Sequence, residues 1–444
     1  MRFRGNVAAC PRSALLSYLA IAERRSTGMS RCNNAGSGEW RWRRVAPGLP
    51  LLLFGSCLTG CGGSDGSGII SPPASTQPTA VENPTPINLY PHQSSTEDPL
   101  FTLMVNSVGS VSVSMPLGFD SGSAGVTLFA QSIFPASMVS TAGFVFPSGE
   151  TSITYNGITV TNLQGTRSYG TLNQTVEHGN LGFATLTFGD STATLTTLTM
   201  PVFLFYSVDY VTGNGYQTPT WQGWFGVAST NGTIVVPGSI EPAGGYGACT
   251  EQSTTTCYVV SGLKYVDYGT QVNAGFMLSP TPNFPTCDIT AAGSCAPQGV
   301  LTVGVNAALE NGFSTSPLTC PPNGYVGPLD IAGYPVCQKT INDVIITATG
   351  ASVGSYTSGA IFDTGTSYMY LSTPPTSSFP SSVEPGSTIS ITTPSTFNFV
   401  YDAGSGTADT VVAAGADGNS IIGLEYFKTN YFLLDFTSSV VGWK

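Results

Sequence analysis

The chain is poor in charged residues and in histidine. Only 9% of its 444 residues are charged, and its two histidines are His92 and His178. Neither histidine has an evident carboxylate partner or lies in a Cys-His pattern, so we expect both to be exposed polar residues. This argues against a Ser-His-Asp or Cys-His hydrolase and against a histidine-ligated zinc site.

Positive charge is scarce in most of the chain. Nine of the 14 basic residues lie in the first 60 positions, whereas five basic and 23 acidic residues follow from Cys61 onward. A body with a formal charge of −18 repels nucleic acid and anionic lipid surfaces, so we expect no nucleic-acid partner. A general solubility charge explains this balance as well as an adaptation to acid does.

Helix signals are rare and turn residues are abundant, with 53 Gly and 31 Pro. Alternating apolar and polar residues at 101–105, 111–115 and 153–160 predict strands, the last of them around an Asn-Gly turn. Only residues 307–312 suggest a short helical turn. The composition predicts an all-β protein.

Residues 1–60 have the pattern of a signal region, and Met29 is an alternative start because residues 1–28 show no secretion pattern. A basic stretch at 41–44 precedes a short apolar run at 50–60. That run is far shorter than the roughly 20 residues that cross a bilayer, so it predicts export rather than a membrane-spanning helix.

The signal region ends in Leu-Thr-Gly-Cys at 58–61, which resembles a bacterial lipobox that would acylate Cys61. Cys57 is a competing candidate, and a cleaved signal without lipid is the alternative. Gly62 after the lipid cysteine resembles sorting to the outer membrane, facing the periplasm or the cell surface. The lipid would be the only membrane contact. Gly, Ser, Thr and Pro dominate residues 61–98, which predicts a flexible tether.

Two separated stretches share one pattern: apolar residues, then Asp, a hydroxyl residue, Gly and a second hydroxyl residue. They are Asp120-Ser121-Gly122-Ser123 and Asp363-Thr364-Gly365-Thr366. The apolar residues predict a buried strand that ends at the carboxylate, and the turn lets backbone N–H groups point back at it. A single triplet is ordinary turn chemistry. Two copies can bring two carboxylates together to share one proton.

These repeats resemble the pepsin-like aspartic proteases, and further stretches extend the resemblance from about Leu100 to the C-terminus. Apolar-apolar-Gly elements at 224–226 and 421–423 are similar to the strands beneath the catalytic turns of that family. Residues 167–171 resemble its flap, and residues 431–443 resemble its closing strands.

The resemblance implies an all-β, bilobal fold with one catalytic Asp in each lobe. The N-terminal lobe would span 99–235 and carry the flap, and the C-terminal lobe would span 236–444 and carry a Cys-rich insertion. Two lengths depart from the family pattern, since 230–342 is long and 363–421 is short.

The same resemblance assigns roles to single residues. Asp120 and Asp363 would form the acid pair, and Tyr169 with Gly170 would belong to the substrate-binding flap, although a hairpin aromatic without a catalytic role is the alternative for Tyr169. Thr127 departs from the family, since many members have a Trp there that braces the flap tyrosine. The residues expected to support the catalytic turns are Ser121, Gly122, Ser123, Thr364, Gly365 and Thr366.

Six cysteines follow Cys61, and six cysteines in an exported protein allow 15 pairings. Close spacing favours three loop staples: Cys249 with Cys257, Cys287 with Cys295, and Cys320 with Cys337. The sequence has no Cys-x-x-Cys spacing that would indicate a metal site, so we expect no metal and no cofactor.

The function that follows is an aspartic endopeptidase, expected to be a monomer that takes a polypeptide substrate. The alternative is a catalytically inactive pepsin-like lipoprotein that binds a peptide or a glycan. A third possibility is a β-rich scaffold in which the two triplets are exposed turns far apart.

Overall fold

The structure is a computed structural model that describes residues 78–92, 99–170, 175–210, 221–235, 256–289, 295–321, 329–375, 377–403, 410–414 and 418–444. The chain divides into two compact units, Met1–Ile69 and Ile70–Lys444, and every described residue belongs to the second. The signal region and Cys61 lie outside the described residues.

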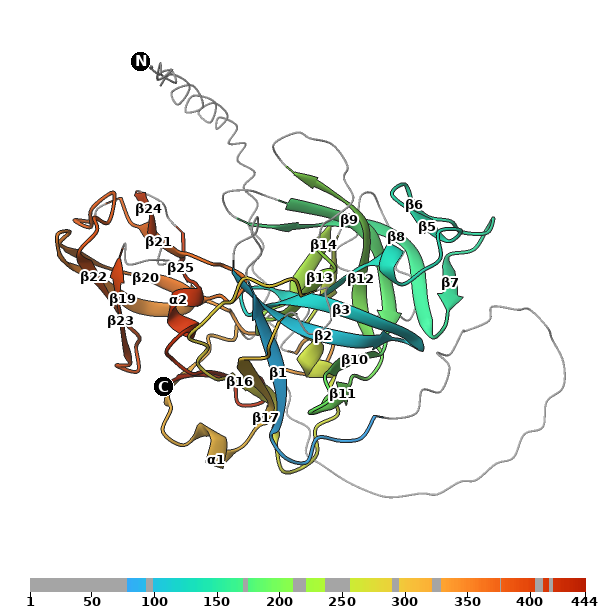
Figure 1. The fold of residues 1–444 in the computed structure, drawn as a ribbon, viewed down its shortest axis with the longest axis horizontal. Helices are drawn as coiled ribbons and strands as arrows, with labels where there is room; N and C mark the ends of the chain where they lie inside the picture. The colour runs from blue at the N-terminus through green and yellow to red at the C-terminus, as the bar shows by residue number, and fades with distance from the viewer. Residues whose placement is uncertain are drawn as a thin grey trace, which may run out of the picture. The chain divides into compact units, whose positions relative to one another are not determined.

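An N-terminal lobe consists of strands that belong to an 18-stranded sheet (Figure 1). Its strand β4 is buried at every position, which is the pattern of a strand covered on both faces. The small strands β5 (Val139–Ser140) and β6 (Gly143–Phe144) pair separately, and two 3-10 turns are η1 (Ala130–Ser132) and η2 (Gly262–Tyr265). The strands of this lobe are β2 (Leu100–Val108), β3 (Val111–Asp120), β4 (Ala124–Phe129), β7 (Ser152–Tyr155), β8 (Ile158–Tyr169), β9 (Thr175–Ala184), β10 (Leu186–Gly189), β11 (Thr194–Thr196), β12 (Met200–Tyr210), β13 (Gly223–Val227), β14 (Gly232–Val235) and β15 (Thr256–Val259).

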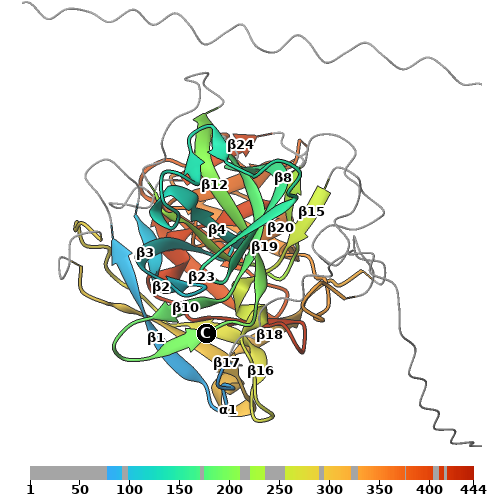
Figure 2. The same ribbon diagram turned by 90° about the vertical axis from the view of Figure 1, so that its right-hand side faces the viewer.

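Six further strands of the same sheet link the lobes. The strand β1 pairs with β17 through residues 85–89 and with β2 through residues 90–92, and it lies beside β17 in both views (Figure 2). The apolar side chains Phe119 and Phe276 meet edge to face beneath this junction. The six strands are β1 (Thr85–His92), β16 (Asn273–Leu278), β17 (Gly299–Val305), β18 (Ser314–Pro317), β26 (Phe432–Asp435) and β27 (Val440–Trp443).

The C-terminal lobe is a seven-stranded sheet in the order β23-β22-β19-β20-β25-β21-β24. In β23 the side chains of Phe399, Tyr401 and Ala403 are buried and those between them are exposed, as expected for a strand with one face on the core. The strands are β19 (Ile341–Gly350), β20 (Gly354–Phe362), β21 (Met369–Thr373), β22 (Ser387–Thr392), β23 (Asn398–Ala403), β24 (Thr410–Ala414) and β25 (Ser420–Ile422). Two single-turn helices are α1 (Ala307–Glu310) and α2 (Leu424–Phe427).

The predicted all-β, bilobal architecture is confirmed, as are the strands around the Asn-Gly turn and the short helix near residue 307. Two predicted boundaries are wrong. The predicted tether to residue 98 contains β1, whose Ile87 and Leu89 are fully buried. This polar stretch forms a strand because its two apolar side chains are covered by the neighbouring strands. The predicted lobe boundary at 235 separates β14 from β15, which are paired.

Candidate active site

The same three-strand arrangement occurs once in each lobe around an aspartate. In the N-terminal lobe β13 lies parallel to β3 and antiparallel to β4, and it places Gly226 beside Asp120. In the C-terminal lobe β25 lies parallel to β20 and antiparallel to β21, and it places Ile422 beside Phe362, the residue before Asp363. Each aspartate therefore stands at the end of a strand whose last residues are mostly buried, as the apolar residues before it predict.

The first carboxyl is held by its own turn. The backbone N–H groups of Gly122 and Ser123 donate to Asp120 Oδ1 at 2.7 Å and 3.0 Å, and Ser123 Oγ donates to Oδ2 at 2.5 Å. The second carboxyl has the matching contacts. The Gly365 N–H donates to Asp363 Oδ1 at 2.8 Å, and Thr366 Oγ1 donates to Oδ2 at 2.7 Å.

The two carboxyls face each other within hydrogen-bonding reach. A Cβ atom on Gly122 would lie 2.3 Å from Asp363 Cγ, and one on Gly365 would lie 2.8 Å from Asp120 Cγ, so only glycine allows this approach. Burial of Asp363, the charge of Asp120 and the hydrogen bond between the two carboxyls raise the pKa of Asp363 to about 7.

Ser121 and Thr364 join the two turns by reciprocal hydrogen bonds. The Ser121 N–H donates to Thr364 Oγ1 at 2.9 Å, and the Thr364 N–H donates to Ser121 Oγ at 3.0 Å. Each hydroxyl also donates to a carbonyl of the opposite lobe, Ser121 to Phe362 and Thr364 to Phe119. All four groups are buried, so this contact holds the lobes in register.

The predicted flap is the hairpin of β8 and β9, and the turn residues 171–174 lie outside the described residues. Tyr169 is the last residue of β8, and Gly170 follows it with φ +84°. The Tyr169 ring lies 5.9 Å from the Trp224 ring, and its hydroxyl is buried beside Thr127 without a well-formed hydrogen bond. Burial raises the pKa of Tyr169 well above its ordinary value.

Trp224 therefore packs on the tyrosine although the position expected for a bracing Trp holds Thr127. Thr127 Oγ1 accepts a hydrogen bond from the Trp224 N–H at 3.1 Å. Gly118 makes room for the indole, because a Cβ there would lie 2.5 Å from the ring. This packing of Trp224 was not predicted, although the sequence has a Trp two residues before the Gly of the apolar-apolar-Gly element at 224–226.

Two buried ionisable side chains within the β8–β9 hairpin were also not predicted. Arg167 and Glu177 are opposite each other in the β8–β9 register and are buried. Arg167 donates to the Ala124 carbonyl, and its guanidinium lies 5.0 Å from the Tyr169 ring centre. Burial raises the pKa of Glu177 to about 7, although the charge of Arg167 opposes the shift. Sequence alone does not distinguish them from exposed charges.

Two of the predicted disulfides are present, Cys287–Cys295 and Cys320–Cys337. Cys257 is disulfide-bonded, but its predicted partner Cys249 lies outside the described residues. In the described part of the chain no cluster of His, Cys, Asp and Glu could hold a metal ion. No helix among the described residues is long and apolar enough to span a membrane.

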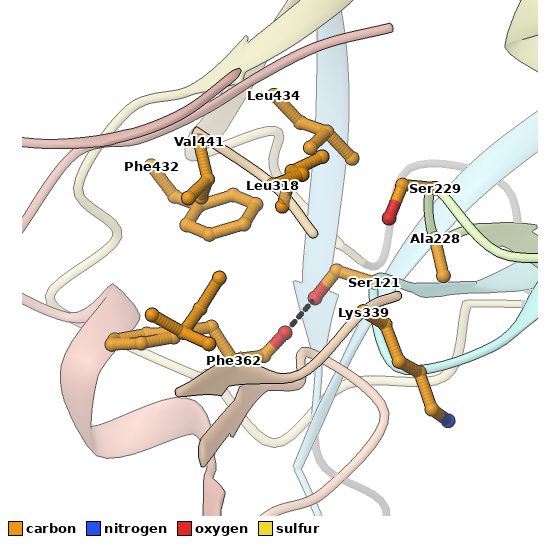
Figure 3. Close-up of a pocket in the computed structure, with 10 residues that line it drawn as sticks. Ser121, Ala228, Ser229, Leu318, Lys339, Phe362, Phe432, Leu434 and Val441 are labelled. Carbon is orange, nitrogen blue, oxygen red and sulfur yellow. Dashed lines mark hydrogen bonds between the residues drawn. The ribbon is translucent and has the colours of Figure 1, made fainter. Parts of the chain in front are cut away.

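A small cavity of about 20 Å³ lies beneath the two turns, next to Ser121 and Phe362 (Figure 3). Apart from Ser121, Ser229 and Lys339 its walls are apolar, and the Ser121 hydroxyl is turned to the Phe362 carbonyl. The cavity is therefore part of the packing beneath the turns, and it is too small for a substrate side chain.

The chain matches no protein-family model and no curated protein sequence. Among solved structures it is similar to the crystal structure of the aspartic proteinase from Irpex lacteus, with 16% sequence identity and a TM-score of 0.46. The match covers 81% of this chain and 97% of that chain. At this distance the similarity assigns neither family membership nor activity.

Proposed function

We propose that the protein is an aspartic endopeptidase in which Asp120 and Asp363 activate a water molecule. The observation that supports this most is the facing pair of carboxyls, each held by its own turn and each approached by the glycine of the other turn. The raised pKa of Asp363 is what two carboxyls that share one proton require.

The contacts favour a division of roles within the pair. Asp120 accepts three hydrogen bonds from its turn and Asp363 accepts two, so negative charge is better stabilised on Asp120. Asp120 would take a proton from water, whose oxygen then attacks the peptide carbonyl. Asp363 would donate its proton to the carbonyl oxygen. Tyr169 would cover the bound substrate and exclude water.

The test is cleavage of an unfolded protein by the full chain between pH 3 and 8, with and without pepstatin. We expect cleavage that falls as the pH rises past about 7, because the pair then loses its shared proton. We expect Asp120→Asn and Asp363→Asn each to lower kcat/KM by at least about a thousandfold. The exposed Asp402 on β23 provides the matched control, Asp402→Asn.

Cleavage that survives both substitutions in the acid pair would refute the proposal. A folded parent chain that binds unfolded peptide without cutting it would instead favour the binding-module alternative.

We also propose that the protein is an exported bacterial lipoprotein anchored through Cys61. The disulfides Cys287–Cys295 and Cys320–Cys337 support an oxidising compartment. Mass spectrometry of the N-terminal peptide from the native host should find a diacylglyceryl-modified Cys61. An unmodified peptide that begins elsewhere would contradict this.

A further inference from the structure

Only five basic residues follow Cys61, and one of them reaches the first catalytic turn. The Lys339 ammonium donates a hydrogen bond to the carbonyl oxygen of Gly122. Lys339 precedes β19 of the C-terminal lobe, so this contact crosses between the lobes. The other four contact different groups: Arg167 the Ala124 carbonyl, Lys264 Asp330, Lys428 Glu425, and Lys444 the Phe313 ring.

The Gly122 carbonyl and the Ser123 N–H belong to one peptide group. That N–H donates to Asp120 Oδ1 at 3.0 Å. A cation at the oxygen end of a peptide group polarises it and makes its N–H a stronger donor, since hydrogen bonds in a chain reinforce one another. The ammonium thus acts on Asp120 through one peptide group without touching the carboxylate.

The segment that carries Lys339 is held at several points. The disulfide Cys320–Cys337 lies two residues before it. The Gln338 N–H donates to the Thr319 carbonyl at 2.8 Å, and Ser229 Oγ donates to the Gln338 carbonyl at 3.3 Å. Figure 3 shows Lys339 close to Ser121, with its ammonium directed away from the small cavity. This anchoring lowers the entropy cost of placing a flexible lysine.

We propose that Lys339 is a positioning residue that keeps the negative charge of the acid pair on Asp120. The inference rests on the proposed function. It adds to the asymmetry that the unequal hydrogen bonds of the two turns already create, because the cation acts on the first turn. The ammonium of Lys339 donates to the Gly122 carbonyl, so it acts through the Gly122–Ser123 peptide group.

Other charged or titratable groups face the first turn, but they do not account for a difference in pH profile between the compared proteins. Asp363 titrates with Asp120 as one pair. Burial raises the pKa of Tyr169 well above its ordinary value, and Arg167 is unchanged between the compared proteins. Glu177, in β9, has a pKa of about 7, but this side chain is unchanged between the compared proteins.

The test compares the parent chain with Lys339→Met and Lys339→Arg. It uses Lys428→Met, which removes a half-buried cation paired with Glu425, as the matched control. Two quantities are measured: the pH profile of kcat/KM on an unfolded protein, and the titration of ¹³C-carboxyl-labelled aspartates by NMR. We expect Lys339→Met to move the low-pH limb, and the lower apparent pKa of the pair, upward by about half a pH unit. Lys339→Arg, which keeps the cation, should stay near the parent.

The outcomes separate this inference from the proposed function. If the parent cleaves but the Lys339→Met profile and titration coincide with the parent, the inference is wrong and the proposed function stands. Lower activity with an unchanged titration of the pair would show a merely structural lysine and would also overturn it. If the parent does not cleave, an upward shift of the titration in Lys339→Met still supports the effect of Lys339 on the pair.

Discussion

Single small residues determine whether the two aspartates can meet. Gly122 and Gly365 leave space for the opposite carboxyl, and the hydroxyls of Ser121 and Thr364 tie the two turns together. Gly423 leaves space for the backbone that follows the second turn, since a Cβ there would lie 2.1 Å from the Tyr368 carbonyl oxygen. The site thus depends on the absence of side-chain volume as much as on its acids.

At this scale we predict the effect of Thr364→Val, which keeps the shape and removes the hydroxyl. The buried Ser121 N–H and Phe119 carbonyl would lose their partner, so the free energy of unfolding should fall by about 2–4 kcal/mol. Urea denaturation measures this, and the cleavage rate should fall as well. The exposed Thr349→Val on β19 should change stability by less than about 0.5 kcal/mol. Equal stability of the two variants would contradict the prediction.

The hairpin of β8 and β9 has an acidic side chain in its interior. It carries a buried carboxyl, Glu177, whose Oε1 lies 3.4 Å from Thr127 Oγ1 and 3.3 Å from Trp221 Nε1. Its pKa rises from 4.5 to about 7 because it is buried. Between these values the folded protein keeps a proton that the unfolded chain has lost. Stability should therefore fall as the pH rises through this window.

For this element we predict that Glu177→Gln reduces the loss of stability between pH 4.5 and 7.5 by about 3 kcal/mol. Part of the slope should remain, because the pKa of Asp363 is raised in the same direction. Urea denaturation at the two pH values measures the difference. Glu384→Gln, at an exposed position, is the control and should keep the parental slope. An identical slope in Glu177→Gln would mean that Glu177 is already ionised in the folded protein at low pH.

For the whole molecule, the strand β1 is the connection between the sheet of the N-terminal lobe and the strands that link the lobes. It pairs with β17 at one end and β2 at the other, and it buries Ile87 and Leu89 completely. A chain that lacks it would expose the edge of β17 and open two large gaps in the core.

We therefore predict that a chain beginning at Pro78 keeps the melting temperature of the chain beginning at Gly62. A chain beginning at Ser94 should melt roughly 10 °C lower or fail to fold, since each buried Ile or Leu contributes about 2–5 kcal/mol. Calorimetry on the three chains measures this. If all three melt together, β1 would not belong to the cooperative unit.

Local residue patterns were enough to locate the two aspartates, the turns that follow them and the strands that precede them. Asp120 and Asp363 follow apolar runs and precede hydroxyl-Gly turns, and this information is local, since strand ends and tight turns depend on a few neighbouring residues. The close spacing of cysteines likewise predicted Cys287–Cys295 and Cys320–Cys337.

Long-range packing determines which distant residues meet around these turns. The packing of Trp224 on Tyr169, the burial of Glu177 and the contact of Lys339 with Gly122 each join elements far apart in the chain. The membership of β1 in the fold is of the same kind, because its pairing partner β17 lies some 200 residues away. Such contacts arise when sheets close on one another, and no local pattern of residue types encodes which side chains will then face each other.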